Sequence, residues 1–422
     1  MHFLSKPSLQ SSQNSFINLI FAPKKIRVII TSAVNNKNTK KYANIFARAY
    51  LVVNNKNHDI EFLRAIAIAY VFLAHIPSLL SPDSFYFQIF NISRFGSGVD
   101  LFFCVSGFIV TRSLLVKGIH SMSGISFIKE TKEFYIKRMW RLLPAAFFWI
   151  ITSLILAVAM EKTHAFLPIE KLLTSALFSV TQTQNFYFLS CRDNGTCGNL
   201  GIYWSLSLEN QFYLLLPILL FTLNNKKLCL LMAVVFAVQF FLPRTLNNHT
   251  PIGWPLRTDA MALGVIIAVL SLKNRIASVD LRLFSNPIIS SSFLILMCFF
   301  LAIFTKPEPV IFFQTGLTAL ASGCLVFIAS FNKNYFCKNK HFMMVTDYIG
   351  SRSYSLYLTH VIALSVTRGL FMNGSIDYTN MGTIIRLSFF FILTFALTEF
   401  SYHYIENKYR YYWKRDAKSR HY

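Results

Sequence analysis

Long apolar blocks separated by short polar segments run through the chain from about residue 58 to residue 407. Most of these blocks approach the roughly 20 residues that a helix needs to cross a bilayer. The pattern predicts an all-α polytopic membrane protein with about ten transmembrane helices. The predicted spans are 60–80, 95–115, 142–160, 203–223, 228–243, 257–272, 287–304, 310–331, 345–370 and 382–404.

The composition supports a membrane location. Hydrophobic residues make up 54% of the chain and charged residues only 14%, against roughly 25% charged in an ordinary soluble domain. This excludes an ordinary globular enzyme. The net charge of +23 is compatible with nucleic-acid binding, but the 43 Phe and 19 Tyr lie in long apolar runs. We therefore expect membrane lipid, and no nucleic acid, as a partner.

The basic residues fall into alternate loops, which predicts the topology because Lys and Arg are retained on the cytoplasmic side. With the N-terminus inside, every inner loop is basic and the outer loops are close to neutral. Both termini are therefore predicted to be cytoplasmic. Segment 171–189 is apolar but contains Gln182, Gln184 and Asn185, and counting it as a span would invert every later loop. We assign it to an outer loop, lying in the membrane interface.

The two ends of the chain differ from the middle. Residues 1–57 are basic and contain no Asp or Glu. They are read as a basic cytoplasmic extension; the alternatives are a transit peptide or a misassigned start, with translation beginning nearer Leu51. We expect three regions: this extension at 1–57, a membrane domain at 58–407 and a basic cytoplasmic tail at 408–422.

Of seven cysteines, only Cys191 and Cys197 lie close together in a polar segment. The predicted topology places this segment outside, where an oxidising compartment would permit a small disulfide ring; the alternative is two unrelated thiols. No His/Cys cluster has zinc-like spacing, so we predict no metal site.

Ionisable residues inside apolar helices are the main functional signal, because they are kept mainly where they line a polar cavity. Arg64 and His75 are eleven residues apart, which places them within about 20° on one helical face and about 16 Å apart along the axis. A mid-membrane imidazole can accept a proton from a hydroxyl. The alternative is a packing histidine bonded to a nearby carbonyl.

Arg138 and Arg141 are spaced i, i+3 at the expected start of the span 142–160, so they share a face near a predicted helix N-terminus. Exposed backbone N–H groups and guanidinium groups there suit a phosphate-rich ligand. The alternative is a positive-inside anchor, which we favour for this pair taken alone.

Other polar groups interrupt the apolar runs. Glu209 lies about two turns into a span and could pair with His75 or Arg257, or orient a substrate hydroxyl. For Asp100 and Asp259, a structural ion pair is at least as good an explanation as a direct role. His360 is a further polar intrusion.

The order of these motifs resembles the acyltransferase-3 family of membrane O-acyltransferases. The resemblance covers about residues 58 to 410. It is carried by Glu61-Phe-Leu-Arg-Ala-Ile-Ala with His75, Gly98-Val-Asp-Leu-Phe-Phe, Tyr135-Ile-Lys-Arg-Met-Trp-Arg, Trp204-Ser-Leu-Ser-Leu-Glu, Arg257-Thr-Asp-Ala, Ile349-Gly-Ser-Arg-Ser-Tyr-Ser-Leu-Tyr-Leu and Tyr402-His-Tyr-Ile-Glu-Asn. Two departures are Asn210, where a second acid is common, and Lys408, where a proline often stands.

The resemblance implies transfer of an acetyl group from cytoplasmic acetyl-CoA to a sugar hydroxyl of a surface polysaccharide or lipid-linked glycan, at a bacterial inner membrane. Some members of the family carry a fused extracytoplasmic hydrolase-like domain; since the sequence ends about 15 residues after the last predicted span, we expect no such domain here. It assigns catalysis to His75, Arg64 and Glu209. The remaining candidates, implied as substrate-binding residues, are Arg138, Arg141, Asp100, Arg257, Asp259, Ser205 and Tyr354.

Two mechanisms fit these residues: His75 deprotonates the acceptor for direct attack, or it carries the acyl group briefly. A function of another class is also compatible with them. In a secondary transporter exporting a lipid-linked sugar or an anion, Arg64, His75 and Glu209 would form a proton relay. The two halves of the chain show no convincing similarity of the kind that transporters often have, and the ordered motifs favour the enzyme.

Overall fold

The computed structural model describes residues 56–409, apart from 82, 85–87, 90–91, 245–248, 251–252, 273–280, 306–310 and 373–378. The chain divides into two units at Lys56, and the described residues belong almost wholly to the second, which begins at Asn57. The predicted basic extension and basic tail lie almost entirely outside the described residues.

The described part of the chain is all-helical, as the apolar blocks predict, and contains no strand. The helices in order are α4 (His58–His75), α6 (Gly98–Val116), α7 (Gly124–Ala159), α8 (Ile169–Val180), α9 (Gln184–Asp193), α10 (Tyr203–Thr222), α11 (Asn225–Phe240), α12 (Asp259–Ser271), α14 (Arg282–Ser285), α15 (Pro287–Ile303), α16 (Gln314–Ala329), α17 (Lys340–Phe371) and α18 (Asn380–Phe400). A π-helical segment, Ser401–Glu406, continues α18.

Within the described residues, four helical stretches are long and apolar enough to cross a membrane: His58–Leu79, Gly98–Val116, Gly124–Ala159 and Asn380–Tyr409. Helices α12, α15 and α16 are apolar but shorter. The finding supports a membrane protein, while the number of ten spans and the cytoplasmic termini stay predictions. Helix α8 has 12 residues, which at 1.5 Å per residue gives about 18 Å, too short to cross the hydrocarbon core.

Helix α7 differs most from its predicted span. The prediction began at residue 142, but the helix has 36 residues and begins at Gly124, where the Ser123 hydroxyl caps the backbone N–H of Ser126. Its first half is rich in Lys and Glu. Both residues are good helix formers, but they are too polar for this half to be included in a membrane span predicted from hydropathy. Pro144 lies inside the helix.

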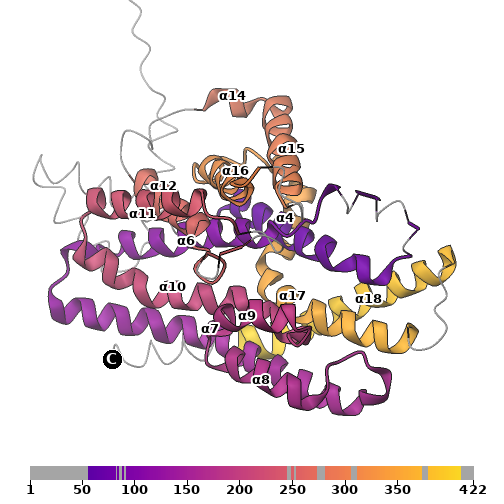
Figure 1. Ribbon diagram of the computed structural model, residues 1–422. Helices are drawn as coiled ribbons and strands as arrows, with labels where there is room; N and C mark the ends of the chain where they lie inside the picture. The colour runs from indigo at the N-terminus through magenta and orange to yellow at the C-terminus, as the bar shows by residue number, and fades with distance from the viewer. Residues whose placement is uncertain are drawn as a thin grey trace, which may run out of the picture. The chain divides into compact units, whose positions relative to one another are not determined.

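Helices α6 and α12 lie side by side (Figure 1). They pack closely because glycines face each other across the contact. A Cβ on Gly107 would lie 2.4 Å from the Met261 carbonyl oxygen, and one on Gly264 would lie 2.2 Å from the Cys104 carbonyl oxygen. Only glycine permits this approach, which is a common way for membrane helices to pack. The contact holds the N-terminal ends of both helices together, where four charged residues meet.

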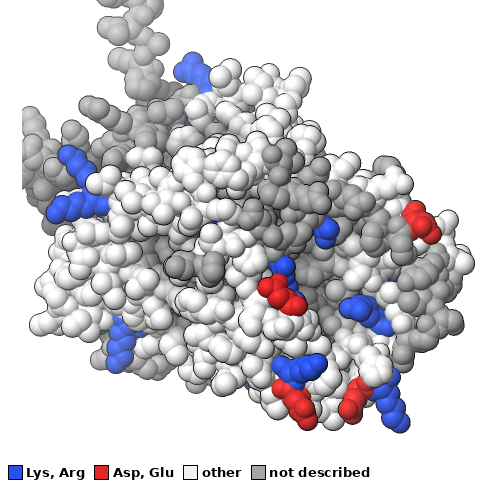
Figure 2. Space-filling model, viewed as in Figure 1, with Lys and Arg blue, Asp and Glu red and all other residues white. Residues whose placement is uncertain are grey.

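Among the described residues on the face shown in Figure 2, charged side chains are sparse and uncharged ones predominate. Large apolar side chains stay exposed along α7, α11, α15 and α18, including Ile151, Val234, Ile295 and Ile392. Exposed apolar surface of this extent suits a hydrocarbon solvent.

Candidate active site

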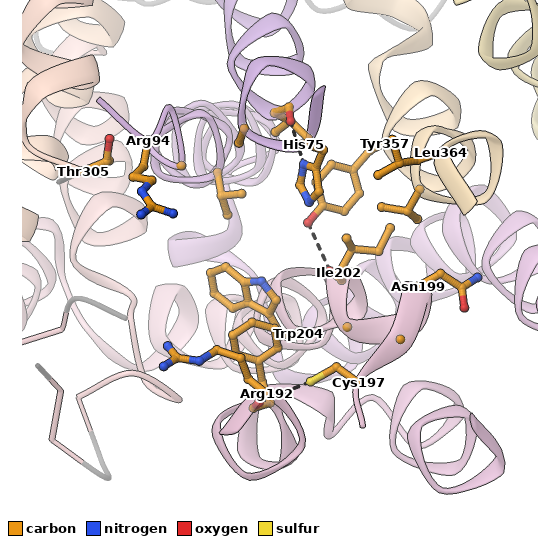
Figure 3. A pocket seen from close by; sticks show the side chains of 18 of the residues that line it. His75, Arg94, Arg192, Cys197, Asn199, Ile202, Trp204, Thr305, Tyr357 and Leu364 are labelled. Atoms are coloured by element: carbon orange, nitrogen blue, oxygen red, sulfur yellow. Dashed lines mark hydrogen bonds between the residues drawn. The ribbon is translucent and has the colours of Figure 1, made fainter. Parts of the chain in front are cut away.

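Two cavities lie back to back among α4, α6, α10 and α17. The larger has a volume of about 750 Å³ and contains His75 in its wall; we call it the His75 cavity (Figure 3). The smaller has a volume of about 350 Å³ and is lined by Arg64, Arg138 and Arg141; we call it the arginine cavity. The predicted basic and histidine residues therefore fall in adjacent but separate cavities.

His75 is the last residue of α4, and its ring is held in one orientation. Its Nδ1 lies 2.7 Å from the Val71 carbonyl oxygen, one turn earlier. Because a carbonyl oxygen can only accept, Nδ1 donates, and Nε2 of the neutral ring carries the lone pair. The contact to a nearby carbonyl is the one expected for a packing histidine, and it also gives the tautomer that a general base requires.

The ring of His360, on α17, packs edge-on against His75, with 4.9 Å between the ring centroids. His360 is fully buried, and its Nδ1–H donates to the Tyr357 carbonyl oxygen at 2.7 Å. Among the described residues its Nε2 has no hydrogen-bond partner. The sequence marked His360 as a polar intrusion, but its distance along the chain hid its contact with His75.

Arg64 lies in the wall of the arginine cavity, on the same helix as His75. It donates to Ser353 Oγ on α17 at 2.8 Å and to Glu61 Oε1 at 3.2 Å. Its side chain is 14% exposed. These two contacts fix the guanidinium at the cavity rather than in the lipid phase.

Arg138 and Arg141 also line the arginine cavity, but not at a helix end. The predicted helix N-terminus is wrong, because the polar first half of α7 continues the helix before them. Backbone N–H groups there are used within the helix, so any anion must bind the side chains. Arg138 stacks over the Tyr213 ring at 4.8 Å, and the buried Nε of Arg141 has no partner among the described residues.

Glu209 lies in the wall of the arginine cavity. Ser106 Oγ donates to its Oε1 at 2.5 Å, and the Tyr213 hydroxyl also donates to Oε1. Of the possibilities considered, pairing with His75 or Arg257 is not found among the described contacts, while a role in orienting a substrate hydroxyl stays a prediction. The sequence could have indicated Tyr213, which is four residues away on the same helical face, but a neutral serine in an apolar helix gives no signal.

Tyr357 and Val99 line both cavities and so form part of the wall between them. The Tyr357 hydroxyl is 2.7 Å from Ser205 Oγ and 3.1 Å from the Ile202 carbonyl oxygen. Ser205 and Tyr354, both predicted from the resemblance, line the arginine cavity. The Tyr354 hydroxyl donates to the Leu142 carbonyl oxygen at 2.6 Å, which joins α17 to α7.

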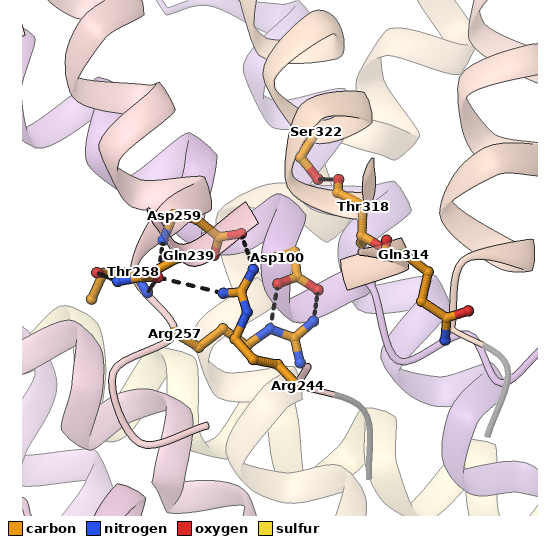
Figure 4. Close-up of polar contacts among 9 residues, drawn as sticks. All are labelled: Asp100, Gln239, Arg244, Arg257, Thr258, Asp259, Gln314, Thr318 and Ser322. Carbon is orange, nitrogen blue, oxygen red and sulfur yellow. Dashed lines mark hydrogen bonds and ion pairs between the residues drawn. The ribbon is translucent and has the colours of Figure 1, made fainter. Parts of the chain in front are cut away.

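Two buried ion pairs lie where α6 and α12 begin (Figure 4). Arg257 binds both oxygens of Asp100, at 2.8 and 2.5 Å, and Arg244 lies 2.7 Å from Asp259. Gln239 accepts from the backbone N–H groups before and at Asp259. Asp100 and Asp259 line neither cavity, so the structure favours the structural-pair interpretation, whereas Arg257 reaches the His75 cavity.

Cys191 and Cys197 form a disulfide at the edge of the His75 cavity, which Cys197 lines. The bond joins α9 to Cys197, the residue that precedes the 3₁₀ turn Gly198–Ile202, and this turn leads into α10. A disulfide persists in an oxidising compartment, which is compatible with the predicted outer location of this segment.

Replacing Cys191 and Cys197 with serine should destabilise the protein by about 2 kcal/mol, because the bond closes a short loop in the unfolded chain. The measurement is the urea unfolding midpoint in detergent, with and without reductant. The control is the double replacement Cys229→Ser and Cys324→Ser, which removes two thiols that form no disulfide. Equal midpoints for the oxidised and reduced wild type would contradict the prediction.

No group of three His, Cys, Asp or Glu side chains able to hold a metal is present among the residues that the structure describes. The groups that line the two cavities include an imidazole, guanidinium groups, a carboxylate and hydroxyls. Such groups can transfer protons and bind anions.

Comparison with known proteins identifies the family. The family model of the acyltransferase domain matches residues 57–400. The chain belongs to the acyltransferase-3 family. This assignment favours the enzyme over the transporter.

Similar proteins carry O-acetyltransferase names. The chain is 27% identical over 373 residues to the peptidoglycan O-acetyltransferase OatA of Listeria monocytogenes, covering 83% of this chain and 55% of that protein. It is 25% identical over 397 residues to the O-acetyltransferase OatA of Staphylococcus aureus strain NCTC 8325, covering 89% of this chain and 60% of that protein. A protein of Staphylococcus aureus strain COL is 28% identical, and the chain spans 57% of its length. No solved structure matches the chain.

Proposed function

We propose that this protein is a membrane-embedded O-acyltransferase of the bacterial inner membrane, which moves an acetyl group from acetyl-CoA to a sugar hydroxyl of a surface polysaccharide. Family membership and the names of its relatives support acetyl transfer. The single observation that carries the assignment is His75, held as a general base in the wall of a cavity that adjoins a cavity lined by arginines.

The donor enters the arginine cavity from the cytoplasmic side. The phosphates of acetyl-CoA are bound by the side chains of Arg138 and Arg141, since guanidinium groups form paired charge-assisted hydrogen bonds with phosphate. The unpartnered Nε–H of Arg141 is one donor for this contact. Because Tyr357 lies in the wall between the two cavities, its side chain must turn aside before the thioester reaches His75, which lies about 16 Å along the axis of α4 from Arg64.

Transfer at His75 proceeds as one addition followed by one elimination. Nε2 of His75 takes the proton of the acceptor hydroxyl while the hydroxyl oxygen forms a bond to the thioester carbonyl carbon. The carbon–sulfur bond then breaks, and the CoA thiolate takes the proton back from His75. The products are the sugar acetyl ester and free CoA, and His75 returns to its neutral form.

The test incubates the purified full chain in nanodiscs with radiolabelled acetyl-CoA and bacterial cell-envelope glycans. We expect release of CoA and transfer of the labelled acetyl group to the glycan, where it is bound as an ester that base removes. Folded protein that neither binds acetyl-CoA nor transfers label would overturn the proposal.

The double variant Arg138→Ala and Arg141→Ala should raise the KM for acetyl-CoA by about tenfold or more while kcat changes less. Each lost charge-assisted hydrogen bond costs about 1.5–3 kcal/mol of donor binding. Initial rates at varied acetyl-CoA concentration give both constants. The matched control is Lys226→Ala with Lys227→Ala, which removes two exposed cations outside both cavities. An unchanged KM would contradict phosphate binding by these arginines and favour their alternative role as topology anchors.

A further inference from the structure

The wall of the His75 cavity is basic. Among the described residues that line it there is no Asp or Glu, while arginines and histidines recur around it. The arginines are Arg94, Arg192, Arg244, Arg257 and Arg368, and the histidines are His75 and His164. Arg244 and Arg257 are each paired with an Asp that does not line the cavity, so the charge that faces the cavity comes from the other arginines. A lining of one sign in a low-dielectric setting raises the local concentration of ligands of the opposite sign.

Three of these arginines come from separate elements. Arg94 precedes α6, Arg192 lies in α9 and Arg368 lies near the end of α17. Partial burial lowers the pKa of the Arg94 guanidinium from its ordinary value, but an arginine stays protonated in proteins. Within the described part of the chain Arg368 forms no ion pair, and Arg192 contacts its neighbour Asp193 at 3.2 Å. Figure 3 shows Arg94 and Arg192 in the cavity wall together with His75.

An aromatic cluster lines the same cavity. Trp204, Trp254 and Phe188 all contribute to its wall, and the rings of Phe188 and Trp254 stack with 5.6 Å between centroids. Trp254 is 5% exposed, and its Nε1–H has no hydrogen-bond partner among the described residues. Flat apolar surface beside an available donor suits the face of a sugar ring with its hydroxyls.

We propose that the His75 cavity binds an anionic glycan acceptor: a sugar whose carboxylate or phosphate is held by Arg94 and Arg368, with the ring against Trp204 and Trp254. The inference rests on the proposed function, because it names the substrate class of the same site. The negative group comes either from an acidic sugar or from the phosphates of a lipid carrier. Both present an anion, and the experiment separates them.

The experiment measures dissociation constants with the full chain in nanodiscs of uncharged lipid. One pair of probes is glucuronyl-N-acetylglucosamine and its neutral glucosyl counterpart. The second pair is N-acetylglucosamine linked to a short prenyl diphosphate and the same sugar linked to the prenyl alcohol. Each is titrated against wild type, Arg94→Gln, Arg368→Gln and the control Arg282→Gln, an exposed arginine that lines neither cavity.

We expect the acidic member of at least one pair to bind about tenfold tighter than its neutral partner. Arg94→Gln and Arg368→Gln should each remove most of that difference and leave the neutral probes and the control within twofold. A preference in the first pair identifies an acidic sugar, and one in the second identifies the carrier phosphates. Equal binding of acidic and neutral probes, or no binding of any probe, would overturn the inference.

Two further outcomes separate this inference from the proposed function. Acetyl transfer to neutral glycans without an acidic preference would support the acyltransferase and exclude an anionic acceptor. Selective binding of acidic probes without any acetyl transfer would support the anion-binding site and exclude the acyltransferase activity. If Arg94→Gln and Arg368→Gln instead weakened acetyl-CoA binding, the basic cavity would belong to the donor, and the inference would be wrong.

Discussion

His75→Ala is expected to lower kcat for acetyl transfer by about 10²- to 10⁴-fold, which is the usual contribution of a positioned general base. The variant keeps the lining of the arginine cavity intact, so the KM for acetyl-CoA should change by less than about twofold. The hydrogen bond that it removes is local, from Nδ1 to the Val71 carbonyl oxygen, so the protein should still fold and insert. Turnover of radiolabelled acetyl-CoA by purified protein gives both constants.

Chemical rescue distinguishes a base from a packing residue. The His75 cavity has room for a small molecule at about 750 Å³, so added imidazole should restore part of the activity of His75→Ala. It should have no effect on the wild type. His341→Ala, at an exposed histidine near the start of α17, is the matched control and should keep full activity. Activity that persists in His75→Ala without imidazole would exclude the assignment.

The spacing of Arg64 and His75 predicted a shared helix, and both residues do lie in α4. It also predicted a shared face, which is sufficient to point both toward the interior of a bundle. It could not show that they enter different cavities, because the wall between those cavities comes from other helices. Val99 and Tyr357, which line both sides, are separated from α4 by tens to hundreds of residues along the chain.

The wrong start of α7 shows a limit of hydropathy. Residues 124–141 contain clusters of charged side chains and no long apolar run, so a search for membrane spans does not include them. Their helical propensity is nevertheless high, and the helix continues into the apolar half without interruption. As a result Arg138 and Arg141 lie in mid-helix. The candidate hydrogen-bond donors to an anion are therefore their side chains, and not the backbone N–H groups of a helix N-terminus.

Partners of buried charges were also hard to predict. Asp100 and Arg257 are 157 residues apart, and several acids and bases were available for each. Their pairing depends on the close approach of α6 and α12, which in turn depends on glycines that carry no signal of charge. The sequence could identify the charged residues that need partners, while tertiary packing determined which partners they found.

Asp100→Ala is expected to destabilise the protein by about 3–5 kcal/mol, because it leaves the guanidinium of Arg257 buried without its carboxylate. The Asp100 side chain is 0% exposed and that of Arg257 is 9% exposed, so water can replace little of the lost contact. Unfolding by urea in detergent, followed by tryptophan fluorescence, gives the free energy. Asp193→Ala is the control, because it breaks an ion pair in which the carboxylate is 53% exposed, and exposed pairs contribute little.

A double-mutant cycle then tests whether the pair acts as a unit. If the cost of Asp100→Ala comes from the stranded guanidinium, replacing both residues by apolar ones, Asp100→Leu with Arg257→Met, should recover most of the lost stability. If the two single changes simply add, the residues act independently and the pair does not join α6 to α12. Because Arg257 also lines the His75 cavity, the double variant should fold and yet bind acceptor less tightly, which would separate the structural contribution of the pair from its contribution to the site.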